Sequence, residues 1–203
     1  MDLVALTRAS LDAVGLATIS AIHRDLDVSA AAGANLGCAY VASSALSNLA
    51  ARHPTWTHGD LVERPLSEIA RAELLRYGFT VFGRSPRTLL ANMTDDDVRR
   101  AARAELTGYW TTAVRHPWWW LDPSIADLGL ISLARARHAR ATGVLITKTS
   151  AIEAVQAPDW LRADLRARRN GNPVTSPRLR TAWVAWCDAR RTTAAARRWR
   201  PSQ

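Results

Sequence analysis

The sequence predicts an α+β protein that is mostly helical. Two short apolar runs near the N-terminus have the length of buried strands, and the segment between them has helical spacing. From Thr94 onward, cap-forming residues and apolar residues three or four apart predict a bundle of about five helices. We therefore expect a partial α/β domain over residues 1–65 and a helical domain over residues 66–203.

In the N-terminal part of the chain, short apolar runs alternate with segments of helical spacing. "MDLVALT" at the N-terminus is too short for a helix and predicts a buried strand. Apolar residues at helical spacing predict a helix over residues 10–26, and "LGCAYVA" (residues 36–42) predicts a second strand. "SSALSNLAARH" predicts a helix capped by Ser43 or Ser44. A strand beginning at residue 2 needs two neighbours to be buried, so we expect a sheet that lacks its first strands.

The next segment leads toward the helical part. "HPTWTHGDLVERP" (residues 53–65) predicts a loop, and residues 66–78 predict an amphipathic helix that ends at Gly78. "FTVFG" (residues 79–83) predicts a short strand or an extended segment, turned by "RSP".

The C-terminal half is predicted to be helical almost throughout. Thr94 caps a helix whose first turn holds three aspartates, and Pro117 stops it. A long helix over residues 122–143 ends at Gly143, and the next helix is expected to begin at Thr149 or Ser150. Two further helices are predicted over residues 158–171 and 176–199.

Composition restricts the class of protein. The net charge of +9 comes from 27 basic residues, of which only Lys148 is a lysine; such a charge favours a polyanionic partner, but an arginine bias also follows from GC-rich coding. Cys38 and Cys187 lie far apart, which supports neither a zinc site nor a disulfide framework and favours a reducing cytoplasm. No segment has the roughly 20 apolar residues that cross a membrane, so no membrane partner is expected.

Nine tryptophans are unusual for 203 residues. Trp118, Trp119 and Trp120 are consecutive and cannot all face one core, so at least one should line a cleft or a domain boundary. The arginine-rich segment over residues 162–200 resembles a nucleic-acid-binding segment in charge. It also contains apolar residues that need burial, so a solvated bundle face is the better account and nucleic acid is not expected as a partner. These apolar residues are Trp183, Val184, Trp186 and Trp199.

Arg135 and Lys148 are candidates for an anion site. A long helix that ends at Gly143, followed by a loop that folds back, could bring the two side chains together. Lysine is a point charge on a flexible stem and arginine a planar fork, so the two complement each other on a phosphate. Thr147 and Thr149 would add donors. The alternative is that Lys148 is a solvated loop residue.

One segment also resembles a known family. "LISLARARHARATGVLITKTSAIEAV" is similar to the helical C-terminal domain of the aminoglycoside adenylyltransferases that modify streptomycin and spectinomycin, and "RAELLRYGFTVFGRSPRTLLANMTDDDVRRA" resembles that family's connector. The resemblance covers residues 66–165 well and the first 60 residues more loosely. It implies a cytoplasmic antibiotic-resistance enzyme that transfers AMP from ATP to an aminoglycoside hydroxyl, with Arg135 and Lys148 contacting the triphosphate.

The resemblance also implies a magnesium site in the N-terminal domain. There the family has a Gly-Ser turn, an Asp-x-Asp pair and a later carboxylate. Asp2 matches the second aspartate, as catalytic residue and metal ligand, whereas the Gly-Ser turn and the first aspartate are missing and Cys38 stands near the later carboxylate. With one of three acidic ligands, the chain as given is expected to bind ATP with Mg²⁺ poorly, which weighs against activity, whereas the resemblance favours an enzyme. A start site placed too late and a degenerate relative are the two explanations, and we favour the first.

For the acceptor, the resemblance implies an acidic cleft with an aromatic residue. Asp122, Asp127 and Trp110 are the candidates, with Glu73 as a weaker one. Helix-start charge compensation and core packing are their alternative roles. The alternative function is a non-catalytic helical protein that binds an anionic ligand or nucleic acid.

Overall fold

The computed structural model describes residues 2–29 and 36–198. The chain divides into two compact units, Met1–Asn92 and Met93–Gln203. This division comes later in the chain than the predicted boundary at residue 65, because α2 (Glu68–Tyr77) belongs to the first unit. There the Arg71 side chain donates hydrogen bonds to the carbonyls of Leu46 and Leu66 at 2.6 and 3.2 Å, which joins the helix to the preceding loops.

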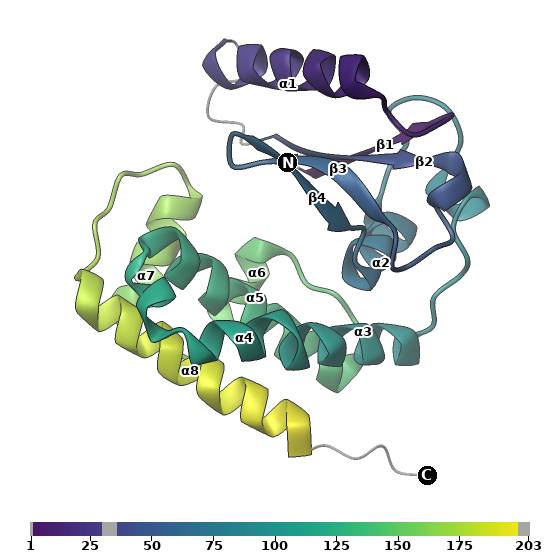
Figure 1. The fold of residues 1–203 in the computed structure, drawn as a ribbon. Coiled ribbons are helices and arrows are strands. Elements are labelled where there is room, and N and C mark those ends of the chain that lie inside the picture. The colour runs from purple at the N-terminus through teal and green to yellow at the C-terminus, as the bar shows by residue number, and fades with distance from the viewer. Residues whose placement is uncertain (1, 30–35, 199–203) are drawn as a thin grey trace. The chain divides into compact units, whose positions relative to one another are not determined.

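The first unit contains a four-stranded mixed sheet in the order β1-β2-β3-β4. β1 (Asp2–Thr7) pairs in parallel with β2 (Gly37–Ala42), as the two apolar runs predicted. α1 (Ala13–Val28) lies in the connection between them and covers one face of the sheet (Figure 1). A crossover of this kind is what a parallel pair requires. β1 is paired on one edge by the described strands.

The predicted loop over residues 53–65 is wrong, because this segment forms a β-hairpin. β3 (Arg52–Thr57) and β4 (Asp60–Pro65) are antiparallel and are joined by His58 and Gly59. Both loop residues have positive φ, 54° and 82°, which is the conformation of a tight two-residue hairpin turn. Pro54 within β3 argued against a strand in the sequence.

Two other predicted elements are also absent from the described residues. The helix over residues 43–53 is only a 3₁₀ turn, η1 (Ser43–Ala45), because the Ser43 hydroxyl donates to Thr7 O at 2.7 Å rather than capping, and Leu46 O accepts from Arg71. Residues 79–83, predicted as a short strand or an extended segment, form no strand and lie in the loop between α2 and η2 (Pro86–Thr88). Its Phe82 is 97% exposed, so no sheet edge covers it.

The second unit is helical, as predicted. The expected helix over residues 94–116 is broken at Gly108 into α3 and α4, and Thr94 caps α3 together with Asp97 in a capping box. The central α5 packs against α3, α6 and α8. The elements are α3 (Asp95–Thr107), α4 (Tyr109–Arg115), η3 (Pro117–Leu121), α5 (Pro123–Thr142), α6 (Lys148–Glu153), α7 (Asp159–Arg169) and α8 (Arg178–Arg198).

The consecutive tryptophans separate as their spacing requires. Trp120 is 1% exposed and donates its indole N–H to Ala113 O at 3.0 Å, whereas Trp118 is 61% exposed. Trp119 is half-buried and its ring stacks on His116 at 4.6 Å. Both cysteines are free thiols. Within residues 2–29 and 36–198, no helix combines the length and apolar character needed to cross a membrane.

Candidate nucleotide-contact site

The candidate site begins where α5 ends. Gly143 has φ 76°, a left-handed conformation that favours glycine, and its N–H donates to Ala139 O at 2.8 Å. The Thr142 carbonyl accepts from Arg99 Nη2 at 3.0 Å, so a side chain of α3 satisfies part of this helix end. The predicted helix end at Gly143 is therefore confirmed.

Gly143 is also held against the start of α3. A Cβ atom at this position would lie 2.5 Å from Asp95 Cβ and 2.9 Å from Asp95 O. Gly143 is buried, so the loop that follows leaves α5 along one direction only. Both the backbone conformation and the close approach require a glycine here.

The loop after Gly143 is fixed by α5 itself. Val144 N donates to Thr142 Oγ1 at 3.0 Å, and Leu145 is 6% exposed. Arg135, two turns back on α5, donates from Nε to Ile146 O at 2.9 Å. The Arg135 guanidinium therefore lies against the loop two residues before Lys148, and a shared anion site of the two side chains stays a prediction.

Lys148 is the first residue of α6, one or two residues earlier than the predicted start. Thr147 caps this helix: its Oγ1 accepts from Ser150 N at 3.0 Å and lies 2.9 Å from Ser150 Oγ. Ala151 and Ile152 are fully buried in the core of the unit. The Lys148 side chain is half-buried, and its contact with a phosphate stays a prediction.

The two candidate acceptor aspartates have structural partners. Asp122 caps α5, accepting from Ser124 N at 2.8 Å. Asp127 forms a bidentate ion pair with Arg168, with N···O distances of 2.6 and 2.9 Å. Arg168 also donates to Ser176 Oγ at 2.7 Å, so the pair ties α5 and α7 to the segment before α8. These are structural roles of the kind that the sequence allowed as alternatives.

The other two candidates lie in different units. Trp110 is 2% exposed in the core of the helical unit, with its ring 5.9 Å from that of Trp120. Glu73 is half-buried on α2 of the first unit. An acceptor contact through any of the four residues stays a prediction.

The expected magnesium ligands lie on the sheet. Asp2 pairs with Gly37 through the β1–β2 ladder, and its side chain falls outside the described side chains. Cys38 on β2 is 5% exposed, and burial raises the pKa of its thiol. Among the described residues, no three carboxylate, imidazole or thiol groups come together as metal ligands. Because the Asp2 side chain lies outside that set, its role as a magnesium ligand stays a prediction.

Two contributors to this site carried no functional signal in the sequence. Arg99 and Asp95 determine where α5 ends, although Asp95 had the signature of an ordinary helix-start acid. That the first turn of α3 lies beside Gly143 is seen only in the folded structure.

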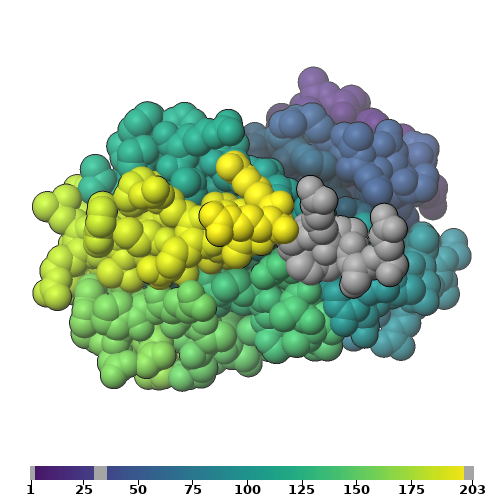
Figure 2. Space-filling view, turned by 90° about the horizontal axis from the view of Figure 1, so that it is seen from below, coloured from purple at the N-terminus to yellow at the C-terminus, as the bar shows by residue number. Residues whose placement is uncertain are grey.

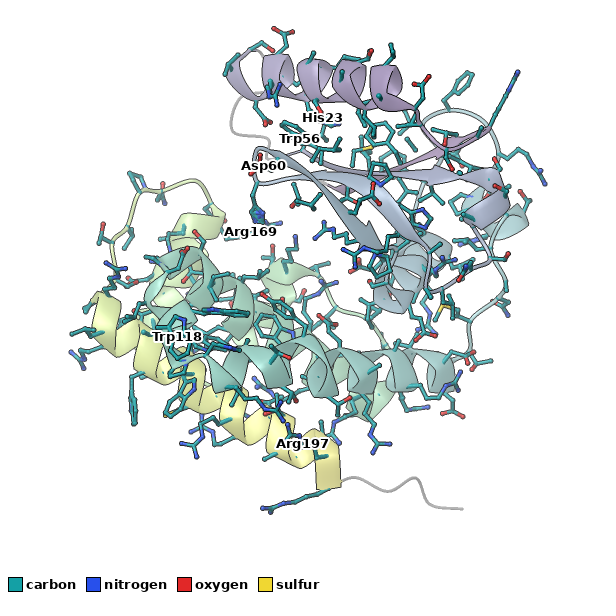
Figure 3. The ribbon with its side chains drawn as sticks, viewed as in Figure 1. His23, Trp56, Asp60, Trp118, Arg169 and Arg197 are labelled. Carbon is teal, nitrogen blue, oxygen red and sulfur yellow. The ribbon has the colours of Figure 1, made fainter. Side chains whose placement is uncertain are left out.

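A buried cluster in the first unit was also missed: His23 stacks on Trp56 at 5.1 Å and lies 2.8 Å from the Tyr40 hydroxyl (Figure 3).

The fold is α+β and mostly helical, with a small mixed sheet followed by helices. A similar solved structure is that of spectinomycin adenyltransferase AAD(9) from Enterococcus faecialis with ATP and spectinomycin: the TM-score is 0.64 and the identity 12% over 96% of this chain and 83% of that one. At this identity the likeness is one of fold alone. No family model matches the sequence, and no curated protein matches it.

Proposed function

We propose that this chain binds the triphosphate of ATP through Arg135 and Lys148, as a protein of the aminoglycoside adenylyltransferase type. The observation that carries the proposal is the 2.9 Å bond from Arg135 Nε to Ile146 O, which holds a guanidinium at the loop that leads into the only lysine. Guanidinium and ammonium groups in one region suit a polyphosphate, the first as a planar fork and the second as a point charge.

The fold supports the same proposal. The structural neighbour was solved with ATP and spectinomycin, and this chain matches its fold over 96% of the present length. In the proposed reaction, an acceptor hydroxyl oxygen bonds to the α-phosphorus of ATP while the bond to pyrophosphate breaks. Arg135 and Lys148 would neutralise the charge that develops on the leaving pyrophosphate. Asp2 is the residue proposed to hold magnesium, and no step is assigned to the ion here.

The acceptor is proposed to be a small cationic molecule of the aminoglycoside type. Asp127 is the acid proposed to meet it, with Asp122 at the same end of α5 and Trp110 of α4 as the aromatic candidate. Glu73 of the first unit is a separate candidate. Binding through Asp127 would require the acceptor to compete with the Arg168 guanidinium, whose two bonds are 2.6 and 2.9 Å long. Asp127→Asn should therefore loosen α7 as well as any acceptor contact.

Isothermal titration of the full chain with ATP, with and without Mg²⁺, tests the nucleotide site. A charged contact to phosphate contributes about 1.5–3 kcal/mol, so Lys148→Ala should weaken the Kd roughly ten- to hundredfold. Arg115→Ala is the matched control, since it removes one exposed cation of the same unit, on α4. Equal losses in the two variants, or no loss with Lys148→Ala, would reject the site.

A second measurement separates binding from catalysis. Pyrophosphate release is followed with ATP, Mg²⁺ and either spectinomycin or streptomycin as acceptor. Release that depends on both acceptor and Lys148 supports adenylyl transfer. ATP binding that depends on Lys148 without any release supports the alternative, a non-catalytic protein that binds an anionic ligand.

A further inference from the structure

The positive charge of this protein belongs to the helical unit. Residues 93–203 contain 19 basic and ten acidic residues, a net of +9, whereas residues 1–92 contain eight of each and are neutral. A coding bias toward arginine would act on both units alike. The segregation of charge therefore needs a cause within the helical unit itself.

Much of this charge lies on the solvent-facing side of α8. The only acidic residue of α8, Asp188, is 0% exposed and pairs with Arg137 at 2.9 Å. The exposed side of the helix thus carries cations and no carboxylate, and Figure 2 shows α8 in yellow at the surface of the unit. The exposed arginines of α8 are Arg178, Arg180, Arg190, Arg191, Arg197 and Arg198.

Shallow grooves flank α8. One, of about 500 Å³, is lined by Arg115 of α4 and by Arg190, Arg191 and Arg197 of α8. A second, of about 640 Å³, shares Arg191 and continues past Trp183. We call these four arginines and Trp183 the arginine face. Within the described chain, the Arg115 and Arg197 side chains make no hydrogen bond or ion pair, and Arg197 lies near the end of α8 (Figure 3).

Trp183 corrects an expectation from the sequence. It was predicted to be buried, but it is 64% exposed, while Trp186 is half-buried at a ring distance of 5.4 Å. The Arg190 guanidinium covers the Trp186 ring at 4.7 Å. Trp199 lies outside the described residues. An open indole ring among arginines offers both a stacking surface and phosphate contacts along one helix face.

We propose that the arginine face binds single-stranded RNA. The guanidinium groups contact successive phosphates, and Trp183 stacks on an unpaired base. A duplex is a poorer partner, because its base faces are stacked and would not contact the indole. A membrane surface is also a poorer partner, because it would require a continuous apolar stripe beside the cations. The sequence argues against a nucleic-acid partner because four apolar residues of this segment need burial; one of the four, Trp183, is exposed in the structure. Arg135 and Lys148 take no part in this surface.

Fluorescence anisotropy with a labelled 20-nucleotide oligouridine and the full chain tests the proposal. Four phosphate contacts predict that log K falls with log salt with a slope of about −3. The double change Arg115→Glu and Arg197→Glu should weaken binding at least tenfold. Arg24→Glu with Arg64→Glu is the matched control: it changes the net charge equally, at two exposed positions of the first unit, and should leave the affinity within about threefold.

The role of the indole has its own test. Trp183→Ala should weaken binding roughly 5- to 100-fold, whereas Trp183→Phe, which keeps an aromatic face, should retain most of the affinity. Equal losses in the two double variants would show attraction by net charge alone and overturn the proposal. So would equal affinity for a duplex of the same length, the absence of binding, or full affinity in Trp183→Ala.

Discussion

Replacing Gly143 by alanine should destabilise the helical unit far more than the same change at Gly171. Both glycines follow a helix and have nearly the same left-handed φ, 76° and 83°. That conformation costs a non-glycine residue about 1–2 kcal/mol, and this is the whole expected cost at Gly171, where a Cβ would meet nothing within 4 Å. At Gly143 the Cβ would lie 2.5 Å from Asp95 Cβ. Overpacking of this kind adds about 1–3 kcal/mol.

Urea denaturation followed by tryptophan fluorescence measures the difference. Eight of the nine tryptophans lie in residues 93–203, so the signal reports mainly on the helical unit. We expect a loss of about 2–5 kcal/mol in the free energy of unfolding for Gly143→Ala and about 1–2 kcal/mol for Gly171→Ala. Equal losses would mean that α3 moves away from the new methyl group at little cost, and the close approach of Asp95 would then not determine the loop.

Three further perturbations test the packing and the buried charges. Gly129→Ala should destabilise by about 1–3 kcal/mol despite the better helix propensity of alanine, because the Cβ would lie 2.4 Å from the Trp120 ring; thermal unfolding checks this. Arg137→Ala removes the Nη1 group that donates to both oxygens of the buried Asp188 carboxylate and should cost about 3–5 kcal/mol, whereas Arg137→Met with Asp188→Leu should cost less in a double-mutant cycle. Burial lowers the pKa of His23 below 6.5, so this histidine takes up a proton in the unfolded chain at a higher pH than in the folded chain. The free energy of unfolding should therefore be at its full value above about pH 6.5 and fall as the pH drops below it, and the fall should be less steep in His23→Gln.

The sequence predicted those elements whose signals are local. Thr94 and Gly143 mark helix ends by cap chemistry, and the two apolar runs mark β1 and β2. The hairpin of β3 and β4 was missed because Pro54 and a His-Gly turn look like a loop, and the pairing of β3 with β2 is a long-range contact. The pairing of Asp127 with Arg168, 41 residues away, was equally inaccessible. Side-chain partners across a bundle depend on helix packing, which local patterns do not specify.

Stability and function are coupled differently at the four residues around the proposed triphosphate site. Gly143 acts through its own backbone, and the Arg99 side chain acts through its bond to the Thr142 carbonyl. Both affect where α5 ends and how the loop leaves it. Arg135 acts through both, since its bond to Ile146 O supports the same loop that it is proposed to share with the ligand. Lys148 follows the cap residue Thr147 and contributes through its side chain. If the loop geometry matters for binding, Gly143→Ala should therefore weaken the binding of ATP at temperatures where the unit is still folded, although the variant retains Lys148. An unchanged Kd in that variant would mean that the lysine stem, rather than the loop, accommodates the phosphate.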